Sequence, residues 1–169
     1  MTSEPRTELR AEQPYVGARG TVTISTIGLI ADRIPEIFGW LGARGTEPAG
    51  APFFRYHVID MSGPMEIEVG VPVAVPPDKI DGDLFAGVLP AGRYATVTHV
   101  GHPDGLARGT AALLAWGERQ GLHWDLADDQ RWGCRLEIYH TDPAVEPDMG
   151  RWETDIAIRL ADEAEGNNG

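Results

Sequence analysis

Residues 132–141, WGCRLEIYHT, decide how this chain is expected to fold. The stretch alternates apolar residues with polar or charged ones, a pattern typical of a β-strand. Its apolar positions are Cys134, Leu136 and Ile138. Alternate residues of a strand point to opposite faces, so Glu137 and Tyr139 project together from the other face. We expect the apolar positions to pack against helices, with Glu137 and Tyr139 on the opposite side of the sheet.

A carboxylate beside a phenol allows two interpretations. Together with some of the five tryptophans of the chain, Glu137 and Tyr139 could hold a planar cation, because aromatic rings attract cations over their faces. The pair also fits an ordinary hydrated sheet face, where single exposed side chains of either kind are normal. The strand by itself leaves both interpretations open.

The composition indicates one compact domain with a real core. The chain has 169 residues, of which 42% are hydrophobic, too many for a disordered chain. The net charge of −12 argues against binding nucleic acid, because phosphates repel an acidic surface, and it favours attraction of cations. The single cysteine, Cys134, excludes an internal disulfide framework and a cysteine-cluster metal site. Its apolar neighbours favour a small core residue over a nucleophile.

The ends of the chain and its hydropathy predict its surroundings. No secretory signal peptide opens the sequence and no apolar run approaches about 20 residues, so we expect a cytoplasmic protein that makes no membrane contact. Residues 1–14 and 161–169 are polar, and both termini are expected to be flexible. The domain itself is predicted over 15–160, in two halves of about 15–80 and 83–160.

The hydrophobic pattern divides the chain into strands and helices. Strands are predicted over 20–26, 53–60, 65–75, 84–89, 93–100, 132–141 and 152–160. Helices are predicted over 31–44 and 105–120, each with an apolar stripe at helical spacing. Asp32 and Asp104 are candidate N-caps for these helices, and Gly45 is a candidate end for the first.

The two halves repeat the same order of elements. Thr21-Val22-Thr23 returns 75 positions later as Thr96-Val97-Thr98, and Gly39-Trp40 is similar to Ala115-Trp116, 76 positions later. Each half runs strand, helix, strand, strand. The order predicts an α+β fold of duplicated βαββ units, which form a curved antiparallel sheet with two helices on one face. A ligand groove is expected between the halves, because such junctions are common pocket sites.

An ordered set of short motifs runs through the chain. Its members are GAPFFRY at 50–56, EIEVGVPV at 66–73, LPAGRYA at 89–95, HVGH at 99–102, EIY at 137–139, TDP at 141–143 and TDI at 154–156. In these motifs the chain resembles the GyrI-like small-molecule-binding domain, which is also the effector-binding domain of AraC-type and MerR-type multidrug regulators. Their order and spacing hold over about 15–160, nearly the whole chain.

The resemblance implies a duplicated βαββ fold with a central groove, in which a carboxylate inside an aromatic cavity meets lipophilic, cationic drugs. Glu137 matches that carboxylate and Tyr139 the aromatic residue two positions later. The candidate ligand-binding residues are Glu137, Tyr139, Trp132, Phe54, Tyr56, His99, Trp116 and Trp152. Our leading hypothesis is a non-catalytic protein that binds lipophilic, often cationic, aromatic compounds.

Two other functions stay open under the same resemblance. Some stand-alone relatives look like hydrolases that open the cyclopropane ring of electrophilic compounds, and here Glu137 would act as general base beside Tyr139. Other forms of the family bind a topoisomerase subunit, so a protein partner is the third possibility. The chain shows no helix-turn-helix or basic region, which puts direct binding to DNA in doubt.

Metal and cofactor chemistry is not expected. His99, His102 and His123 match no metal-ligand spacing, and no cysteine supports them. The sequence has neither the Gly-x-Ser-x-Gly turn of a serine hydrolase nor a glycine-rich phosphate loop.

Overall fold

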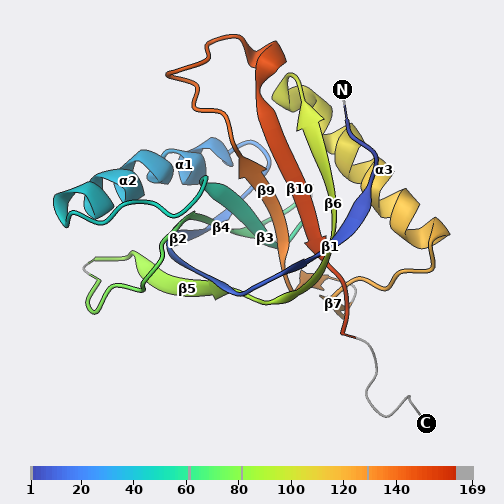
Figure 1. The fold of residues 1–169 in the computed structure, drawn as a ribbon, viewed down its shortest axis with the longest axis horizontal. Coiled ribbons are helices and arrows are strands. Elements are labelled where there is room, and N and C mark those ends of the chain that lie inside the picture. Colours follow the sequence, from blue (N-terminus) through green and yellow to red (C-terminus); the bar gives the residue numbers. More distant parts are fainter. Residues whose placement is uncertain (1, 61, 81, 129, 163–169) are drawn as a thin grey trace.

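The computed structural model describes residues 2–60, 62–80, 82–128 and 130–162 as a curled sheet with helices packed against it (Figure 1). The strands are β1 (Arg6–Arg10), β2 (Gln13–Val22), β3 (Phe53–Val58), β4 (Met65–Pro72), β5 (Phe85–Leu89), β6 (Gly92–Val100), β7 (Leu126–Ala127), β8 (Arg131–Trp132), β9 (Arg135–Tyr139) and β10 (Glu153–Arg159). The helices are α1 (Gly28–Ala31), α2 (Arg33–Ala43) and α3 (Leu106–Arg119), with 3-10 turns η1 (Pro103–Gly105) and η2 (Met149–Arg151). Within this described part of the chain, no helix is long and apolar enough to cross a bilayer.

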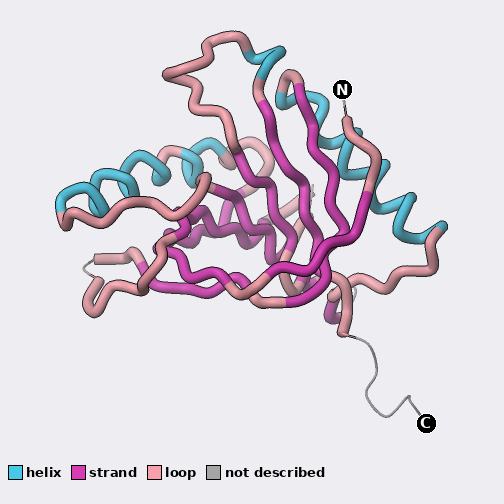
Figure 2. Tube along the Cα trace, viewed as in Figure 1, coloured by secondary structure: helices cyan, strands magenta, loops and turns pink. Residues whose placement is uncertain are grey.

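Eight strands follow one another across the sheet in the order β1-β6-β10-β9-β3-β4-β2-β5, while β8 pairs with β3 and β7 with β8. Neighbouring strands run antiparallel. Figure 2 shows the strands as one curved sheet, with α1 and α2 over one half of it and α3 over the other. The predicted α+β fold with a curved antiparallel sheet is confirmed.

The element order within the sheet follows the predicted pattern. The first half runs β2, α1–α2, β3, β4, and the second runs β6, α3, β9, β10, with β7 and β8 inserted after α3. The halves join where β3 pairs with β9 at the centre of the sheet. Origin of the two halves by duplication stays a prediction.

The first helical region buries one stripe of α2 on the sheet. Ile37 and Leu41, four residues apart on one helical face, are fully buried in a cluster with β2 and β4. Gly45, with φ of 69°, follows the helix end as predicted. Asp32 was expected to cap the N-terminus, and that prediction was wrong. Its backbone is already helical because α1 leads directly into α2, so its side chain makes no capping bond.

The second helical region packs α3 onto the other half of the sheet. Leu113 is fully buried there, and Gly117 lets an aromatic ring come close, since a Cβ at Gly117 would lie 2.3 Å from the ring of Trp124. Asp104 was predicted to cap this helix, and it does not. His102 takes that role for η1, where its Nδ1 accepts a hydrogen bond from the backbone N–H of Asp104 at 3.1 Å.

Both helical regions cover the face of the sheet that carries Glu137. In the strand register Glu137 lies between Phe54 of β3 and Ile156 of β10. Phe54 belongs to the cluster packed under α1 and α2, and Ile156 to the cluster packed under α3. The alternation predicted for this strand is confirmed, but the expectation that helices cover the face of Cys134 and Leu136 was wrong.

The face without helices is buried by curvature instead. Its cluster joins residues from both ends of the sheet, which the curl brings together: Tyr15, Phe53, Leu89, Tyr94, Cys134, Leu136 and Ala157. A strand in such a sheet packs against apolar residues on both of its faces. The face that carries its apolar residues is therefore not always the face that the helices cover. The expected core position of Cys134 is confirmed, since its exposed fraction is 1%.

The first strand predicted from the sequence, 20–26, is observed earlier in the chain, as Gln13–Val22, and another strand precedes it. Arg6–Arg10 forms β1 along β6, and the chain then crosses to the other half, where β2 begins at Gln13 (Figure 1). β1 carries one large apolar side chain, Leu9, which is 81% exposed. The strand therefore depends on backbone pairing rather than on a hydrophobic pattern. Of the C-terminus predicted to be flexible, all beyond residue 162 lies outside the described residues.

Candidate functional site

Glu137 lies at the centre of the sheet, between the two helical regions. Alternation along β9 points Glu137 and Tyr139 to the helix-covered face, and alternation along β3 points Phe54 and Tyr56 to the same face. The sequence had left open whether these two aromatic residues or their neighbours face the groove. The register of β3 with β9 decides it, because Phe54 lies directly opposite Glu137.

Two phenols hold the Glu137 carboxylate. The hydroxyl of Tyr139 donates to Oε1 at 2.6 Å and the hydroxyl of Tyr56 donates to the same oxygen at 2.9 Å. The ring of Phe54 meets the ring of Tyr139 edge-on, with centroids 5.4 Å apart and planes at 89°. The resulting cluster, Phe54, Tyr56, Glu137 and Tyr139, is called the central cluster below.

The tyrosines of the central cluster remain neutral donors. Burial raises the pKa of both hydroxyls well above the ordinary value of 10, and the negative charge of Glu137 raises it further. Glu137 forms no salt bridge with any described residue. Its hydrogen-bonding partners are the two tyrosine hydroxyls, which carry no positive charge.

Two cavities flank the central cluster. The smaller, about 250 Å³, opens between the segment before α1 and the first turns of α3. Its polar groups come from Tyr56, Thr110, Arg135 and Glu137. Its apolar lining comes from Ile24, Ile27, Ile59, Met65, Ala107, Leu136 and Ile156. Because Glu137 stands in its wall, a molecule bound in this cavity can contact the carboxylate.

The larger cavity, about 760 Å³, lies on the other side of the cluster, between α2 and the chain that follows β9. Phe54 and Tyr139 form its floor, and Phe38 and Trp152 add aromatic surface. The rest of the lining, like Phe38, is absent from the site residues predicted from the sequence: Ala31, Ile34, Pro35, Ala51, Pro52, His140, Thr141, Asp142, Pro143, Glu153 and Thr154. This volume is in the range typical of small-molecule pockets.

Five of the eight predicted site residues therefore gather on one face: the central cluster and Trp152. The indole N–H of Trp152 donates to the carbonyl of Glu146 at 2.7 Å, which fixes the ring at the cavity wall. Sequence alternation alone would have found Arg135, two positions before Glu137 and on the same face, which sequence analysis had not considered.

The other three predicted site residues line neither cavity. His99 is 6% exposed, and its Nε2 lies 3.0 Å from the carbonyl oxygen of His102, an arrangement that fixes the turn before α3. Trp116 packs beside the cluster under α3. Trp132 sits on the short β8, because the predicted strand is interrupted at Gly133, and the guanidinium of Arg135 lies over its ring at 4.5 Å.

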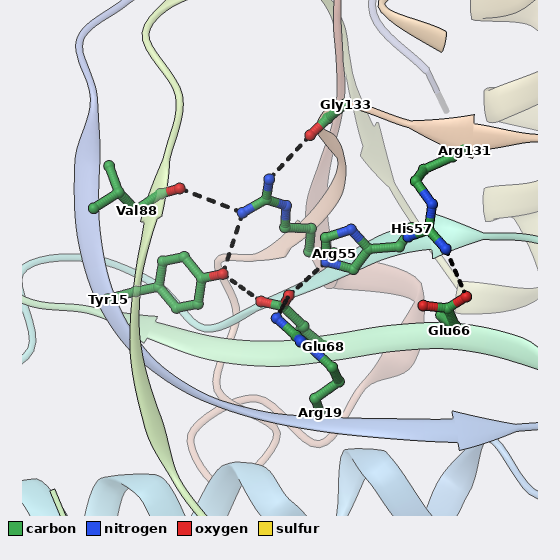
Figure 3. A network of polar contacts seen from close by, with 9 residues as sticks. All are labelled: Tyr15, Arg19, Arg55, His57, Glu66, Glu68, Val88, Arg131 and Gly133. Atoms are coloured by element: carbon green, nitrogen blue, oxygen red, sulfur yellow. Dashed lines mark hydrogen bonds and ion pairs between the residues drawn. The ribbon is translucent and has the colours of Figure 1, made fainter. Parts of the chain in front are cut away.

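A second acidic centre lies on the face without helices. Glu68 of β4 is 1% exposed, and its carboxylate accepts hydrogen bonds from the Tyr15 hydroxyl and from Nη2 of Arg19 at 3.0 Å. Nε2 of His57 lies 2.5 Å from its Oε2. Arg55 donates to the Tyr15 hydroxyl at 3.2 Å and to the carbonyl of Gly133 at 2.9 Å, which joins this group to β9 (Figure 3).

Burial opposes ionisation of Glu68, but its partners outweigh that cost. Hydrogen bonds from His57 and Tyr15, with the positive charges of His57 and Arg55, lower its pKa to about 2. Sequence analysis had not named this centre. The available signal was an acidic residue, Glu68, in the middle of the apolar run IEVGV. Within the described residues, neither centre nor any other group offers three His, Cys, Asp or Glu side chains placed to hold a metal ion.

The chain belongs to the family of GyrI-like small molecule binding domains, whose model matches residues 3–161. The match spans the sheet, both helical regions and the central cluster. It establishes small-molecule binding as the general function of the domain. No curated protein matches the chain in sequence.

Solved structures show the same fold. The C-terminal domain of EcmrR has a TM-score of 0.73 at 20% identity, covering 95% of this chain and 98% of that one. EcmrR in a DNA complex has a TM-score of 0.77 at 21% identity, with 95% of this chain covered, and this chain spans 58% of its length. SAV2435 bound to tetraphenylphosphonium has a TM-score of 0.63 at 11% identity, with 98% of both chains covered. A hydrolase from Listeria innocua has a TM-score of 0.61 at 12% identity, with 94% of this chain and 92% of that one covered.

Proposed function

We propose that this protein binds lipophilic aromatic molecules that carry a cationic group, with Glu137 as the counter-charge. The observation that supports this most directly is the position of Glu137. Its carboxylate has neutral partners from the protein and stands in the wall of a cavity. An ionised carboxylate in an apolar surrounding is costly unless a positive charge accompanies it. A ligand cation supplies that charge.

The surroundings of Glu137 fit such a ligand. The two cavities are lined mainly by aliphatic and aromatic side chains, so the apolar body of a ligand leaves water on binding. Phe54, Tyr139 and Trp152 offer aromatic surface in the larger cavity, and Tyr56 offers its ring beside Glu137 in the smaller one. A cation over an aromatic face gains about 0.5–2 kcal/mol when the site excludes water. The larger cavity also has Asp142 and Glu153 in its wall, which adds to the negative potential.

One structural neighbour supports this ligand class. SAV2435 was solved with tetraphenylphosphonium, which is a lipophilic aromatic cation. EcmrR, in its DNA complex, shows that a domain of this fold can be part of a DNA-bound protein. For the present chain we propose ligand binding alone, in the cytoplasm, without direct contact to nucleic acid. The net charge of −12 supports this, since it opposes contact with phosphates.

Glu137→Gln tests the proposal. The variant keeps the size of the side chain and some hydrogen bonding but removes its charge. Affinity for a cationic dye should fall roughly 10–100-fold, as expected for loss of a charged hydrogen bond, while a neutral dye of the same shape should bind equally well. Both affinities are measured by titration with tryptophan quenching.

Glu66→Gln is the matched control. Glu66 is a partly exposed residue of β4 that forms a salt bridge with Arg131 on the helix-free face. Its loss changes the net charge equally, and it lines neither cavity. If Glu66→Gln weakens cation binding as much as Glu137→Gln does, the attraction is a property of the whole surface. Equal losses for the cationic and neutral dyes in Glu137→Gln would also contradict the proposed role.

Hydrolysis of electrophilic cyclopropanes is a second candidate, favoured by one observation. The hydroxyls of Tyr56 and Tyr139 both donate to Oε1 of Glu137. No described residue donates to Oε2, which can therefore accept a hydrogen bond from a water molecule in the adjoining cavity. Incubation with a cyclopropane electrophile in the absence of added metal, followed by mass spectrometry, tests it. Ring-opened product that disappears in Glu137→Gln would establish the enzyme, and unchanged substrate would leave binding as the function.

A further inference from the structure

Arg135 places a positive charge in the same cavity as Glu137. The two residues are two positions apart on β9 and therefore point to the same face. Both line the cavity of about 250 Å³ between the segment before α1 and the first turns of α3. The guanidinium lies over the ring of Trp132, with its carbon 4.5 Å from the ring centroid. Stacking of this kind holds the guanidinium plane in a defined position.

The two charges share the cavity without neutralising each other directly. In the part of the chain that the structure describes, no salt bridge joins Arg135 to Glu137, and the guanidinium donates no hydrogen bond. Burial lowers the pKa of Arg135 below its usual value, while the negative charge of Glu137 and the Tyr56 hydroxyl act in the opposite direction. Its five N–H donors are thus held in a partly buried place with no acceptor from the described protein.

A cavity with separated charges of both signs favours a different ligand from a cavity with a carboxylate alone. A simple cation placed at Glu137 gains attraction from the carboxylate but is repelled by Arg135 across the same small space. A molecule with a positive group at one end and a hydrogen-bond acceptor at the other can pair with Glu137 and with Arg135 at the same time. Such a molecule also gives the guanidinium the hydrogen bonds that the protein leaves unmade.

We propose that Arg135 determines ligand specificity, and that the preferred ligands are dipolar aromatic molecules. Their cationic or donor group meets Glu137, and a carboxylate or other oxygen acceptor meets Arg135. This inference rests on the proposed binding function and narrows its ligand class. Loss of the guanidinium should convert the cavity into one that prefers permanent cations.

A matched dye pair tests the inference. Rhodamine 6G is a permanent cation, and its free acid carries a carboxylate on the same ring system and is a zwitterion. The measured quantity is the ratio of the two Kd values, cation over zwitterion, from fluorescence anisotropy with wild type, Arg135→Met and Arg135→Lys. Met keeps an apolar side chain of similar length without charge, and Lys keeps the charge without the planar fork.

In Arg135→Met the Kd ratio should fall by roughly 10–100-fold, the effect of removing one hydrogen bond between charged groups. The zwitterion should bind more weakly and the cation more tightly. In Arg135→Lys the ratio should lie between the other two values. Partial loss of folded protein lowers both apparent affinities together, so the ratio still reports on specificity.

Arg131→Met is the control, because Arg131 is an exposed residue of β8 that pairs with Glu66 and lines neither cavity. It should leave the Kd ratio unchanged. An unchanged ratio in Arg135→Met, with cation binding still dependent on Glu137, would overturn the role of Arg135 and leave the proposed function standing. Absence of saturable binding of either dye to wild type would overturn both.

Discussion

Two glutamates of one sheet each accept a hydrogen bond from tyrosine, yet their surroundings differ in kind. Glu68 on the helix-free face has Tyr15, His57 and Arg19 as partners and is 1% exposed. Glu137 on the helix-covered face has two phenols as its hydrogen-bonding partners among the described residues, and it stands beside a cavity. The first carboxylate is neutralised by the protein itself, and the second is left for a partner from outside.

The difference shows that the two faces of one sheet have different roles, one in stability and the other in ligand binding. Around Glu68 the positive charges of Arg19 and Arg55 come from β2 and β3, so the group ties these strands to β4 and, through Gly133, to the chain leading into β9. Around Glu137 the protein supplies aromatic surface, and the two helical regions on this face leave open space between them. A mutation in the first centre should act on stability, and a mutation in the second on ligand binding.

The largest effect on stability is expected from Glu68→Gln. The change leaves His57 and Arg55 without a negative partner in a buried group, and breaking a buried ion pair costs about 3–5 kcal/mol. We expect a loss of about 3 kcal/mol, the lower end of that range, because the side chain of Arg19 is 62% exposed and can be hydrated. Urea denaturation at pH 7 measures it.

Glu66→Gln again serves as the control, since Glu66 lies two residues earlier on the same face of β4. Its pair with Arg131 is exposed, with 43% and 53% of the two side chains accessible, and such pairs contribute about 0–1 kcal/mol. If the unfolding free energy falls equally in both variants, the Glu68 group is not a structural centre of the sheet.

Acid should reduce the contribution of Glu68 in a defined pH window. Its pKa is lowered from 4.5 to about 2 in the folded protein, so its stabilisation is fully present above pH 4.5 and is lost as the pH falls towards 2. The difference in unfolding free energy between wild type and Glu68→Gln should therefore shrink over this window. Urea melts at several pH values between 7 and 2.5 follow it, and a difference that stays constant down to pH 3 would contradict the assignment.

The sequence predicted the order of elements well because most of them carry a clear hydrophobic period. The helix predicted over 105–120 is observed as Leu106–Arg119, and the strand predicted over 152–160 as Glu153–Arg159. β1 escaped prediction because Leu9, its one large apolar residue, is exposed and only the pairing with β6 makes it a strand. Local sequence does not record such a pairing.

The candidate site could be predicted in its chemistry but not in its position. Alternation placed Glu137 with Tyr139 and Phe54 with Tyr56 correctly, and the structure brings the two pairs together through the register of β3 with β9. Which face the helices cover could not be read from β9, because curvature buries the face of Leu136 as well. His99 has the polarity expected of a site residue, but its ring nitrogens contact the Thr2 hydroxyl and the backbone carbonyl of His102, outside both cavities.

The smallest effects, and the sharpest comparison of the two centres, are expected from removing one tyrosine hydroxyl in each. Tyr15→Phe takes a donor from a carboxylate that is 1% exposed, so no water can replace it, and a lost hydrogen bond to a charged group costs about 1.5–3 kcal/mol. Tyr139→Phe takes a donor from Glu137, whose carboxylate adjoins a cavity that water can enter, so the loss should be about 1 kcal/mol or less.

The two substitutions are chemically identical, so the difference between their unfolding free energies isolates the surroundings of the carboxylates. Tyr139→Phe should also leave affinity for a cationic dye within about threefold, since the Glu137 side chain itself is unchanged. Urea denaturation of both variants, with dye titration of Tyr139→Phe, provides the measurement. A larger stability loss in Tyr139→Phe than in Tyr15→Phe would reverse the comparison and make Glu137 the structural carboxylate of the sheet.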